Sequence, residues 1–345
     1  MLQITKNICK GRDFFMDIKR IFDLSITLDK GSFKKVWKQC YSEKKYSGNN
    51  GYQYFDLSME DKGLIILYQN SQYQKKIRIY VNQAVMENNL NNTEKFIHKL
   101  DKRISEYFHS EYFLHDFTLH GLYMSTDIGV GNSKNAAAYL KVLHRLGKVK
   151  GFSPFDCESL DDDSYLCLDG NSNAISFTIY DLAQVMLCQR DHLDIGSKHF
   201  KKIVQNSEGI LRTEIRLTKP KAMRSYTCAT TSPEQIADLS ENSQDIFMDI
   251  FTKVVPYGDF YKKEKAMEII QNEVKNSVMR KKMLYLLDLI PQKKSLLLAQ
   301  KASNCRRNDE VMKAFADIGL SPITISKRQK TSHLQNLYNF LFINV

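Results

Sequence analysis

The chain has 345 residues, of which 43% are hydrophobic and 26% are charged, values of an ordinary globular protein that exclude a wholly disordered chain and allow two domains. Its formal net charge of +11 favours a polyanionic partner, and nucleic acid is the commonest one inside cells. The seven cysteines contain no Cys-x-x-Cys pair, and no apolar run approaches a membrane span, so we expect a cytoplasmic protein with neither a disulfide framework, a zinc ribbon nor a membrane partner.

The first two thirds of the chain mix strand and helix patterns. Residues 22–28 and 63–68 are rich in β-branched and apolar residues, and residues 76–81 alternate apolar with polar ones, which predicts three strands. Apolar residues recur at helical spacing over residues 93–108, with Thr93 expected as the N-cap. A second helix is expected over residues 133–146, ended by a left-handed Gly147.

Three further strands, at residues 117–128, 174–180 and 210–218, each have one apolar and one polar face, because side chains alternate along a strand. The polar faces carry Tyr123, Ser125 and Asp127 in the first strand, Ser176, Thr178 and Tyr180 in the second, and Arg212, Glu214, Arg216 and Thr218 in the third. An antiparallel sheet with helices on its apolar face accommodates such strands. If the three are neighbours, Asp127, Tyr180 and Glu214 share the open face.

This set of side chains suits phosphodiester transesterification. A tyrosine hydroxyl is a poor nucleophile at neutral pH and needs help. A divalent ion held by Asp127 and Glu214 would polarise the phosphate, and oxygen ligands favour Mg²⁺ or Mn²⁺. A basic cluster suited to a phosphate backbone surrounds Glu214 and consists of Arg212, Arg216, Lys219, Lys221 and Arg224. Taken singly, each feature has an ordinary alternative: a packed strand tyrosine, a solvated charged strand, or a turn aspartate.

From about residue 232, helical patterns replace strand patterns, which predicts a sheet-based domain over residues 1–228 and a helical DNA-binding domain over residues 229–345. Residues 308–318 have the spacing of an amphipathic helix that ends at Gly319. A second helix could begin at Ser321 and carry Lys327 and Arg328, which would complete a helix-turn-helix for duplex DNA. The alternative is that residues 323–325 form a short strand.

Two motifs and their order suggest a family. Residues 176–181 read Ser-Phe-Thr-Ile-Tyr-Asp, and residues 209–217 read Gly-Ile-Leu-Arg-Thr-Glu-Ile-Arg-Leu. Upstream, residues 124–128 form a strand with Asp127 before a helix, and residues 316–325 read Ala-Asp-Ile-Gly-Leu-Ser-Pro-Ile-Thr-Ile. Together they resemble the rolling-circle replication initiators of small plasmids and filamentous phages, over residues 64–337. Two features depart from that family's pattern: Gly121 and Tyr123 stand where it has Arg-x-Asp, and Leu182 stands where it has lysine.

The resemblance implies an endonuclease that nicks and rejoins one DNA strand at an origin. Tyr180 would form a phosphotyrosine link, and a divalent ion, Mg²⁺ or Mn²⁺, would be held by Asp127 and Glu214. Origin duplex and single-stranded DNA would be its partners, with a host helicase and a second copy of the chain as further candidates. The alternative is a non-catalytic, sequence-specific DNA-binding regulator on the same scaffold. A basic RNA-binding or assembly protein is a third class.

Overall fold

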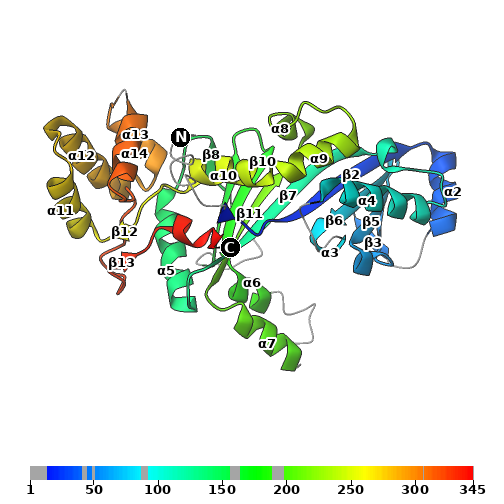
Figure 1. Ribbon diagram of the computed structural model, residues 1–345, viewed down its shortest axis with the longest axis horizontal. Coiled ribbons are helices and arrows are strands. Elements are labelled where there is room, and N and C mark those ends of the chain that lie inside the picture. The colour runs from blue at the N-terminus through cyan, green and yellow to red at the C-terminus, as the bar shows by residue number, and fades with distance from the viewer. Residues whose placement is uncertain are drawn as a thin grey trace. The chain divides into compact units, whose positions relative to one another are not determined.

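The computed structural model describes residues 14–40, 45–48, 51–86, 92–155, 164–188, 198–305 and 307–344 (Figure 1). The fold is α+β, as predicted, with one large antiparallel sheet. Its ten strands are β2 (Lys19–Leu28), β3 (Lys45–Gly48), β4 (Gly51–Asp56), β5 (Leu64–Asn70), β6 (Lys75–Asn82), β7 (Thr118–Gly129), β8 (Phe152–Pro154), β9 (Tyr165–Gly170), β10 (Ile175–Asp181) and β11 (Ile210–Leu217). They are hydrogen-bonded in the order β3-β4-β5-β6-β2-β7-β11-β10-β9-β8.

Helices make up most of the remaining structure. Within the sheet region they are α2 (Lys30–Cys40), α3 (Gln83–Met86), α4 (Thr93–Tyr107), α5 (Ser133–Leu143), α6 (Leu182–Cys188), α7 (Lys198–Asn206) and α8 (Pro220–Met223). After the sheet come α9 (Ser232–Glu241), α10 (Ser243–Val254), α11 (Lys263–Glu273), α12 (Ser277–Lys293), α13 (Leu296–Ala302) and α14 (Asn308–Asp317). Two short strand pairs complete the fold, β1 (Phe14–Phe15) with β14 (Ile343–Asn344), and β12 (Phe260–Tyr261) with β13 (His333–Leu334).

The chain divides into two compact units that do not follow the predicted boundary at residue 228. Unit 1 comprises residues 1–17, 126–214 and 248–345, and unit 2 comprises residues 18–125 and 215–247. Residue 228 therefore falls inside unit 2, between β11 and α9. The cause is that β7 and β11 each contribute residues to both units.

Unit 2 is built on β2–β6, with α4 against the apolar face of β2. The rings of Phe22 in β2 and Phe96 in α4 have centroids 6.1 Å apart, and both side chains are fully buried. Helix α4 begins as predicted, but its N-cap is Asn92 rather than Thr93, since the Asn92 side chain accepts a 2.9 Å hydrogen bond from the backbone N–H of Lys95. On α2, Trp37 packs edge-on against Tyr54, with a centroid distance of 4.3 Å.

Unit 1 contains β8–β10, most of β11, and α5, which packs against β9 and β10. The apolar face of β10 is closed in part by α10, where Phe251 lies 6.0 Å from the ring of Phe177. Helix α5 covers most of the predicted range, and the chain then continues as a single 3₁₀ turn to Leu146 and a Gly147 with φ of 52°.

The last third of the chain is helical, as expected, but the predicted helix-turn-helix has no second helix. After α14, residues 320–330 form no helix. Ile323 and Ile325 are buried, and Ile325 forms a parallel β-bridge with Lys262. The extended alternative is therefore what the structure shows, and the β-bridge between Ile325 and Lys262 is the contact that decides for it.

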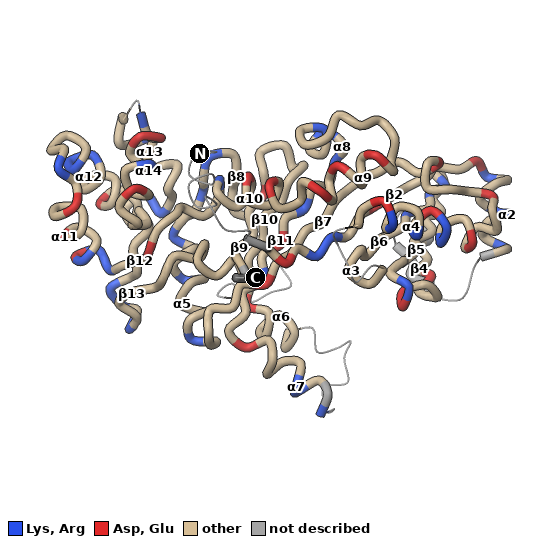
Figure 2. The backbone as a smooth tube through the Cα atoms, viewed as in Figure 1, with Lys and Arg blue, Asp and Glu red and all other residues tan. Residues whose placement is uncertain are grey.

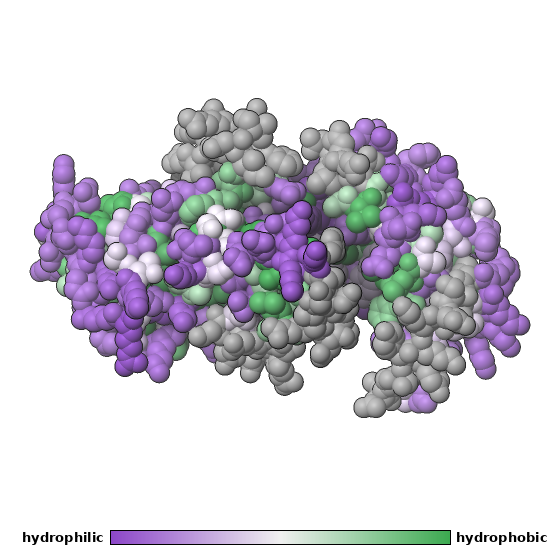
Figure 3. All heavy atoms as spheres, turned by 90° about the horizontal axis from the view of Figure 1, so that it is seen from below, coloured by the Kyte–Doolittle hydropathy of each residue, from purple (hydrophilic) through white to green (hydrophobic). Residues whose placement is uncertain are grey.

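In the described ranges, no helix combines the length and the apolar character that crossing a bilayer requires. Figure 3 shows one face of the protein, on which hydrophilic side chains predominate and hydrophobic ones gather in small areas.

Candidate active site on three neighbouring strands

The three strands with predicted polar faces are adjacent, in the order β7-β11-β10. In β10, Phe177 and Ile179 are fully buried, whereas Ser176, Thr178 and Tyr180 are half-buried. The polar side chains of β11 alternate with buried ones in the same way. The predicted alternation is thus confirmed and the condition that the three strands are neighbours is met, which brings the polar residues of strands distant in sequence to one face.

Asp127 of β7 forms a bidentate ion pair with Arg212 of β11. The guanidinium donates from Nε to Oδ1 at 2.6 Å and from Nη2 to Oδ2 at 2.8 Å. Both side chains are about a quarter exposed, at 30% for Asp127 and 23% for Arg212, so the pair is shielded but reachable from solvent. The hydrogen bonds that Arg212 donates to Asp127 raise the pKa of Arg212, although burial opposes the charge. No sequence pattern indicates this pairing.

Tyr180 of β10 lies next to the same strand. Its hydroxyl donates a hydrogen bond of 2.6 Å to Oε1 of Glu214. Burial raises the pKa of Tyr180, the nearby Glu214 carboxylate raises it further, and Arg212 partly opposes the shift. The phenol is therefore neutral at physiological pH, and its proton already points at a carboxylate. Tyr180, Arg212, Glu214 and Asp127 all belong to unit 1, so they form one local cluster.

The fit of a divalent ion to this cluster depends on the two carboxylates. Both oxygens of Asp127 accept from Arg212, and one oxygen of Glu214 accepts from Tyr180. Nowhere in the described part of the chain do three or more His, Cys, Asp or Glu side chains gather as a metal-binding group. Two carboxylates with phosphate oxygens from a substrate are an adequate set for Mg²⁺ or Mn²⁺. The fit therefore requires Arg212 to leave Asp127, and the ion remains a prediction.

The other predicted basic residues lie in two further places. Arg216, at the end of β11, is exposed, and its Cζ lies 5.9 Å from the ring centroid of Tyr123. Lys219, Lys221 and Arg224 surround α8 and are exposed. In unit 1, Lys327 pairs with Glu264 at 2.8 Å, and Arg328 is exposed. Figure 2 shows lysine and arginine on many elements, α7, α8 and α12 among them.

Local packing accounts for two of the three residues that depart from the pattern of the resemblance, Leu182 and Gly121. Leu182 is buried at the start of α6, where a lysine would have to bury its charge. Gly121 faces Asp23 of β2, and a Cβ on it would lie 3.0 Å from the carbonyl oxygen of Leu217 and 3.5 Å from the Cβ of Asp23. A larger residue at position 121 would therefore displace its neighbours, so the arginine of the pattern does not fit here.

Sequence reasoning missed a second charged cluster, in unit 2. Asp23 is only 2% exposed, and Arg78 of β6 donates to both of its carboxylate oxygens. The available signals were the alternation of residues 76–81, which sets Arg78 and Tyr80 on one face of β6, and an aspartate within the apolar strand expected at residues 22–28.

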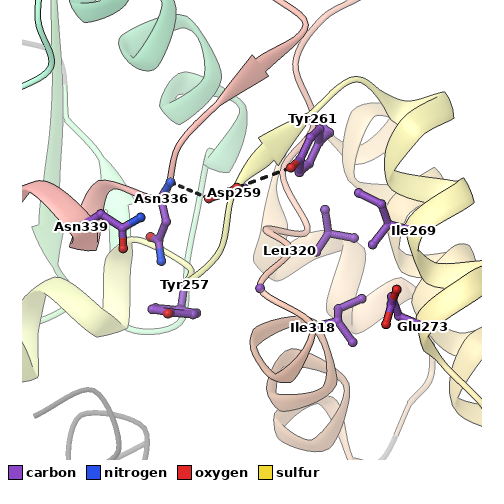
Figure 4. Close-up of a pocket in the computed structure, with 10 residues that line it drawn as sticks. Tyr257, Asp259, Tyr261, Ile269, Glu273, Ile318, Leu320, Asn336 and Asn339 are labelled. Carbon is purple, nitrogen blue, oxygen red and sulfur yellow. Dashed lines mark hydrogen bonds between the residues drawn. The ribbon is translucent and has the colours of Figure 1, made fainter.

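A separate hollow of about 400 Å³ lies in unit 1, beside β12 (Figure 4). Asp259 stands at its centre and accepts hydrogen bonds from the backbone N–H of Asn336 at 2.8 Å and from the hydroxyl of Tyr261 at 3.4 Å. His333 lies 3.0 Å from the same carboxylate. Asp259 therefore braces β12 against β13, and none of the predicted site residues lines the hollow.

Comparison of the sequence with protein-family models gives no match, and no curated protein matches it significantly. The geometry of the cluster and the two motifs are therefore the basis for a functional proposal.

Proposed function

We propose that this protein nicks and rejoins single-stranded DNA through a tyrosine–phosphodiester intermediate, as an initiator of rolling-circle replication. The observation that carries the proposal is the hydrogen bond from Tyr180 to Glu214 beside the Asp127–Arg212 pair, on three adjacent strands. The phenol would be the nucleophile, the carboxylate would accept its proton, and the guanidinium would bind the phosphate. These are the groups that attack on phosphorus requires.

In the proposed step, the Tyr180 oxygen forms a bond to phosphorus and the bond from phosphorus to the 3′-oxygen breaks. The phenolic proton passes to Glu214, and the departing 3′-oxygen takes a proton from water. The products are a 5′-phosphotyrosine and a free 3′-hydroxyl. Because a carboxylate is a much weaker base than a phenolate, the proton moves as the phosphorus–oxygen bond forms rather than before it.

Arg212 is placed to bind the phosphate oxygens, since a guanidinium matches them with two parallel donors. When bound by Asp127 and Glu214, a divalent ion would neutralise charge that develops on the phosphate. Lys221 in α8 and its neighbours Lys219 and Arg224 are exposed and would contact a DNA backbone.

The experiment is a denaturing-gel search for covalent adducts. Wild type, Tyr180→Phe and Tyr73→Phe are incubated with Mn²⁺ and labelled single strands that tile the DNA around the protein's own gene. Tyr73 is 90% exposed and serves as the matched control. We expect an adduct with wild type and Tyr73→Phe and none with Tyr180→Phe. An adduct that survives in Tyr180→Phe would contradict the role of Tyr180.

One observation favours a second candidate, a non-catalytic DNA-binding regulator. Both oxygens of Asp127 are already bonded to Arg212, which is the arrangement of a structural ion pair. The regulator predicts salt-sensitive, sequence-selective binding that Tyr180→Phe leaves unchanged. Selective binding of one segment without an adduct on any segment would decide for it.

A further inference from the structure

The open face of unit 2 carries an aromatic and cationic cluster that the proposed chemistry does not use. It contains Tyr80 of β6, Tyr123 of β7 and the two arginines Arg78 and Arg216, with Asp23 of β2 at its centre. Strand pairing places Asp23 opposite Tyr80 on one side and opposite Gly121 on the other. We call Tyr80, Tyr123, Arg78 and Arg216 the tyrosine platform.

Asp23 holds the platform in place. Arg78 donates from Nε to Oδ1 of Asp23 at 3.1 Å and from Nη2 to Oδ2. A carboxylate that is 2% exposed needs such a partner, because an unpaired buried charge is costly. The guanidinium of Arg78 is therefore fixed rather than mobile.

Each arginine of the platform lies over a ring. The Cζ of Arg78 is 5.3 Å from the ring centroid of Tyr80, and the Cζ of Arg216 is 5.9 Å from that of Tyr123. Both rings are half-buried and Arg216 is exposed, so the rings and the outer cation reach solvent. Burial raises the pKa of both tyrosines, which keeps the phenols neutral.

The charge of this face is positive. Lys76 of β6 lies on the same face as Arg78, and burial followed by the repulsion of Arg78 lowers its pKa. The three positive charges of Lys76, Arg78 and Arg216 outnumber the one negative charge of Asp23. The positive charges of Lys76 and Arg216 would attract an anion to this face. Aromatic faces next to cations are how proteins bind single-stranded nucleic acid, by stacking bases and neutralising phosphates.

We propose that the tyrosine platform stacks bases of a single DNA strand on Tyr80 and Tyr123, while Arg216 and Lys76 contact its phosphates. The choice of DNA rests on the proposed function. The platform binds the strand without taking part in cleavage, and because stacking accepts any base it does so with little sequence preference.

The test measures binding in a background that cannot cleave. All variants carry Tyr180→Phe, and fluorescence anisotropy gives the Kd of a labelled, mixed-sequence 20-nucleotide single strand. We expect Tyr80→Ala and Tyr123→Ala each to raise the Kd about fivefold to 150-fold, the effect of losing one stacked base. Tyr80→Phe and Tyr123→Phe keep the ring and should stay within about threefold of the parent. Tyr73→Ala removes a 90% exposed tyrosine elsewhere and should have no effect.

Three outcomes would overturn the proposal. The first is an unchanged Kd in both alanine variants that unfold at the parent's temperature. The second is an equal loss in the phenylalanine variants, which would assign the effect to the hydroxyls. The third is tighter binding of RNA of the same sequence, or of duplex DNA, than of the single DNA strand.

The outcome is separable from that of the adduct experiment. If the alanine variants bind normally in the Tyr180→Phe background while the wild-type protein forms adducts, the proposed role of the tyrosine platform is wrong and the proposed nicking activity is supported. If ring-dependent binding is found and no adduct forms on any segment, the platform stands and the nickase is wrong.

Discussion

The Tyr180 hydroxyl donates a 2.6 Å hydrogen bond to Oε1 of Glu214 on the neighbouring strand. Burial and the adjacent carboxylate both raise the pKa of Tyr180, so the nucleophile of the proposed reaction starts as a neutral phenol. Of the cluster, Glu214 is the residue that accepts the hydrogen bond from this hydroxyl, so in the proposed reaction it would receive the proton.

Replacing Glu214 with glutamine should slow adduct formation. Glutamine can still accept the hydrogen bond from Tyr180 but cannot take the proton, so we expect the rate to fall about 10²- to 10⁴-fold. A single-turnover assay with the labelled strand measures it, and Glu241→Gln, at an exposed position at the end of α9, is the control. A rate within about twofold of wild type would exclude Glu214 as the proton acceptor.

Replacing Arg212 with glutamine should strengthen Mn²⁺ binding. Asp127 then loses the positive charge that competes with a metal ion for its oxygens. A neighbouring cation typically changes the affinity of a carboxylate for a proton by at least tenfold, and we expect a similar effect on a metal ion. The Kd for Mn²⁺ should therefore fall about tenfold. Isothermal titration calorimetry measures the Kd. The double variant Arg212→Gln with Asp127→Asn should lose the gain, and an unchanged Kd in Arg212→Gln would remove Asp127 from the ligands.

Replacing Asp23 with asparagine should destabilise unit 2. The substitution leaves the charge of Arg78 without its buried partner, and we expect a loss of about 3 kcal/mol in the free energy of unfolding. Urea denaturation measures it. Asp249→Asn breaks the exposed pair with Lys253 and should cost less than about 0.5 kcal/mol. An equal decrease in the free energy of unfolding in the two variants would show that the burial of Asp23 does not strengthen its pair with Arg78.

Alkaline pH should unfold the protein. Burial raises the pKa of Tyr107, Tyr139 and Tyr180 in the folded state, whereas unfolded tyrosines titrate near pH 10. Above pH 10 the unfolded chain binds fewer protons than the folded one, so the free energy of unfolding falls as pH rises, by up to about 1.4 kcal/mol per pH unit for each such tyrosine. Tyr180→Phe should reduce this slope by one tyrosine's share in urea titrations between pH 10 and 11.5. A slope equal to that of wild type would contradict the burial of the phenol.

The alternation of polar and apolar residues was enough to place the site's side chains on one face of each strand. That pattern is local and depends only on the period of a strand, which is why Tyr180 could be assigned to the polar face of β10. The placement of Asp127, Tyr180 and Glu214 on a shared face had a condition, that the three strands are neighbours, and the strand order β7-β11-β10 meets it.

Which side chains pair across neighbouring strands could not be predicted from the sequence. Arg212 could have bonded to Glu214, to solvent or to a phosphate, and the register that pairs it with Asp127 depends on the whole sheet. Strict alternation also fails where β7 has an irregularity. Asp23 pairs with Gly121 and the next residue, Leu24, pairs with Leu119, so His120 is an extra residue and the faces exchange there.

Residues 316–325 are a second case in which a distant contact decides the structure. Residues 316–325 fit both a helix-turn-helix and an extended segment, because Gly319 can end a helix in either case. The β-bridge between Ile325 and Lys262, contributed by a residue about 60 positions earlier, decides for the extended form. Local propensity carries no information about such a partner.

The sharing of β7 and β11 between the units bears on how this protein can be dissected. Because the chain passes between the units four times, at residues 17–18, 125–126, 214–215 and 247–248, neither unit corresponds to one stretch of the gene. A fragment ending at residue 228 would lack α9, α10 and every element after them, and so would include neither unit whole. Point substitutions in the full-length chain are consequently the sound way to separate DNA binding from cleavage.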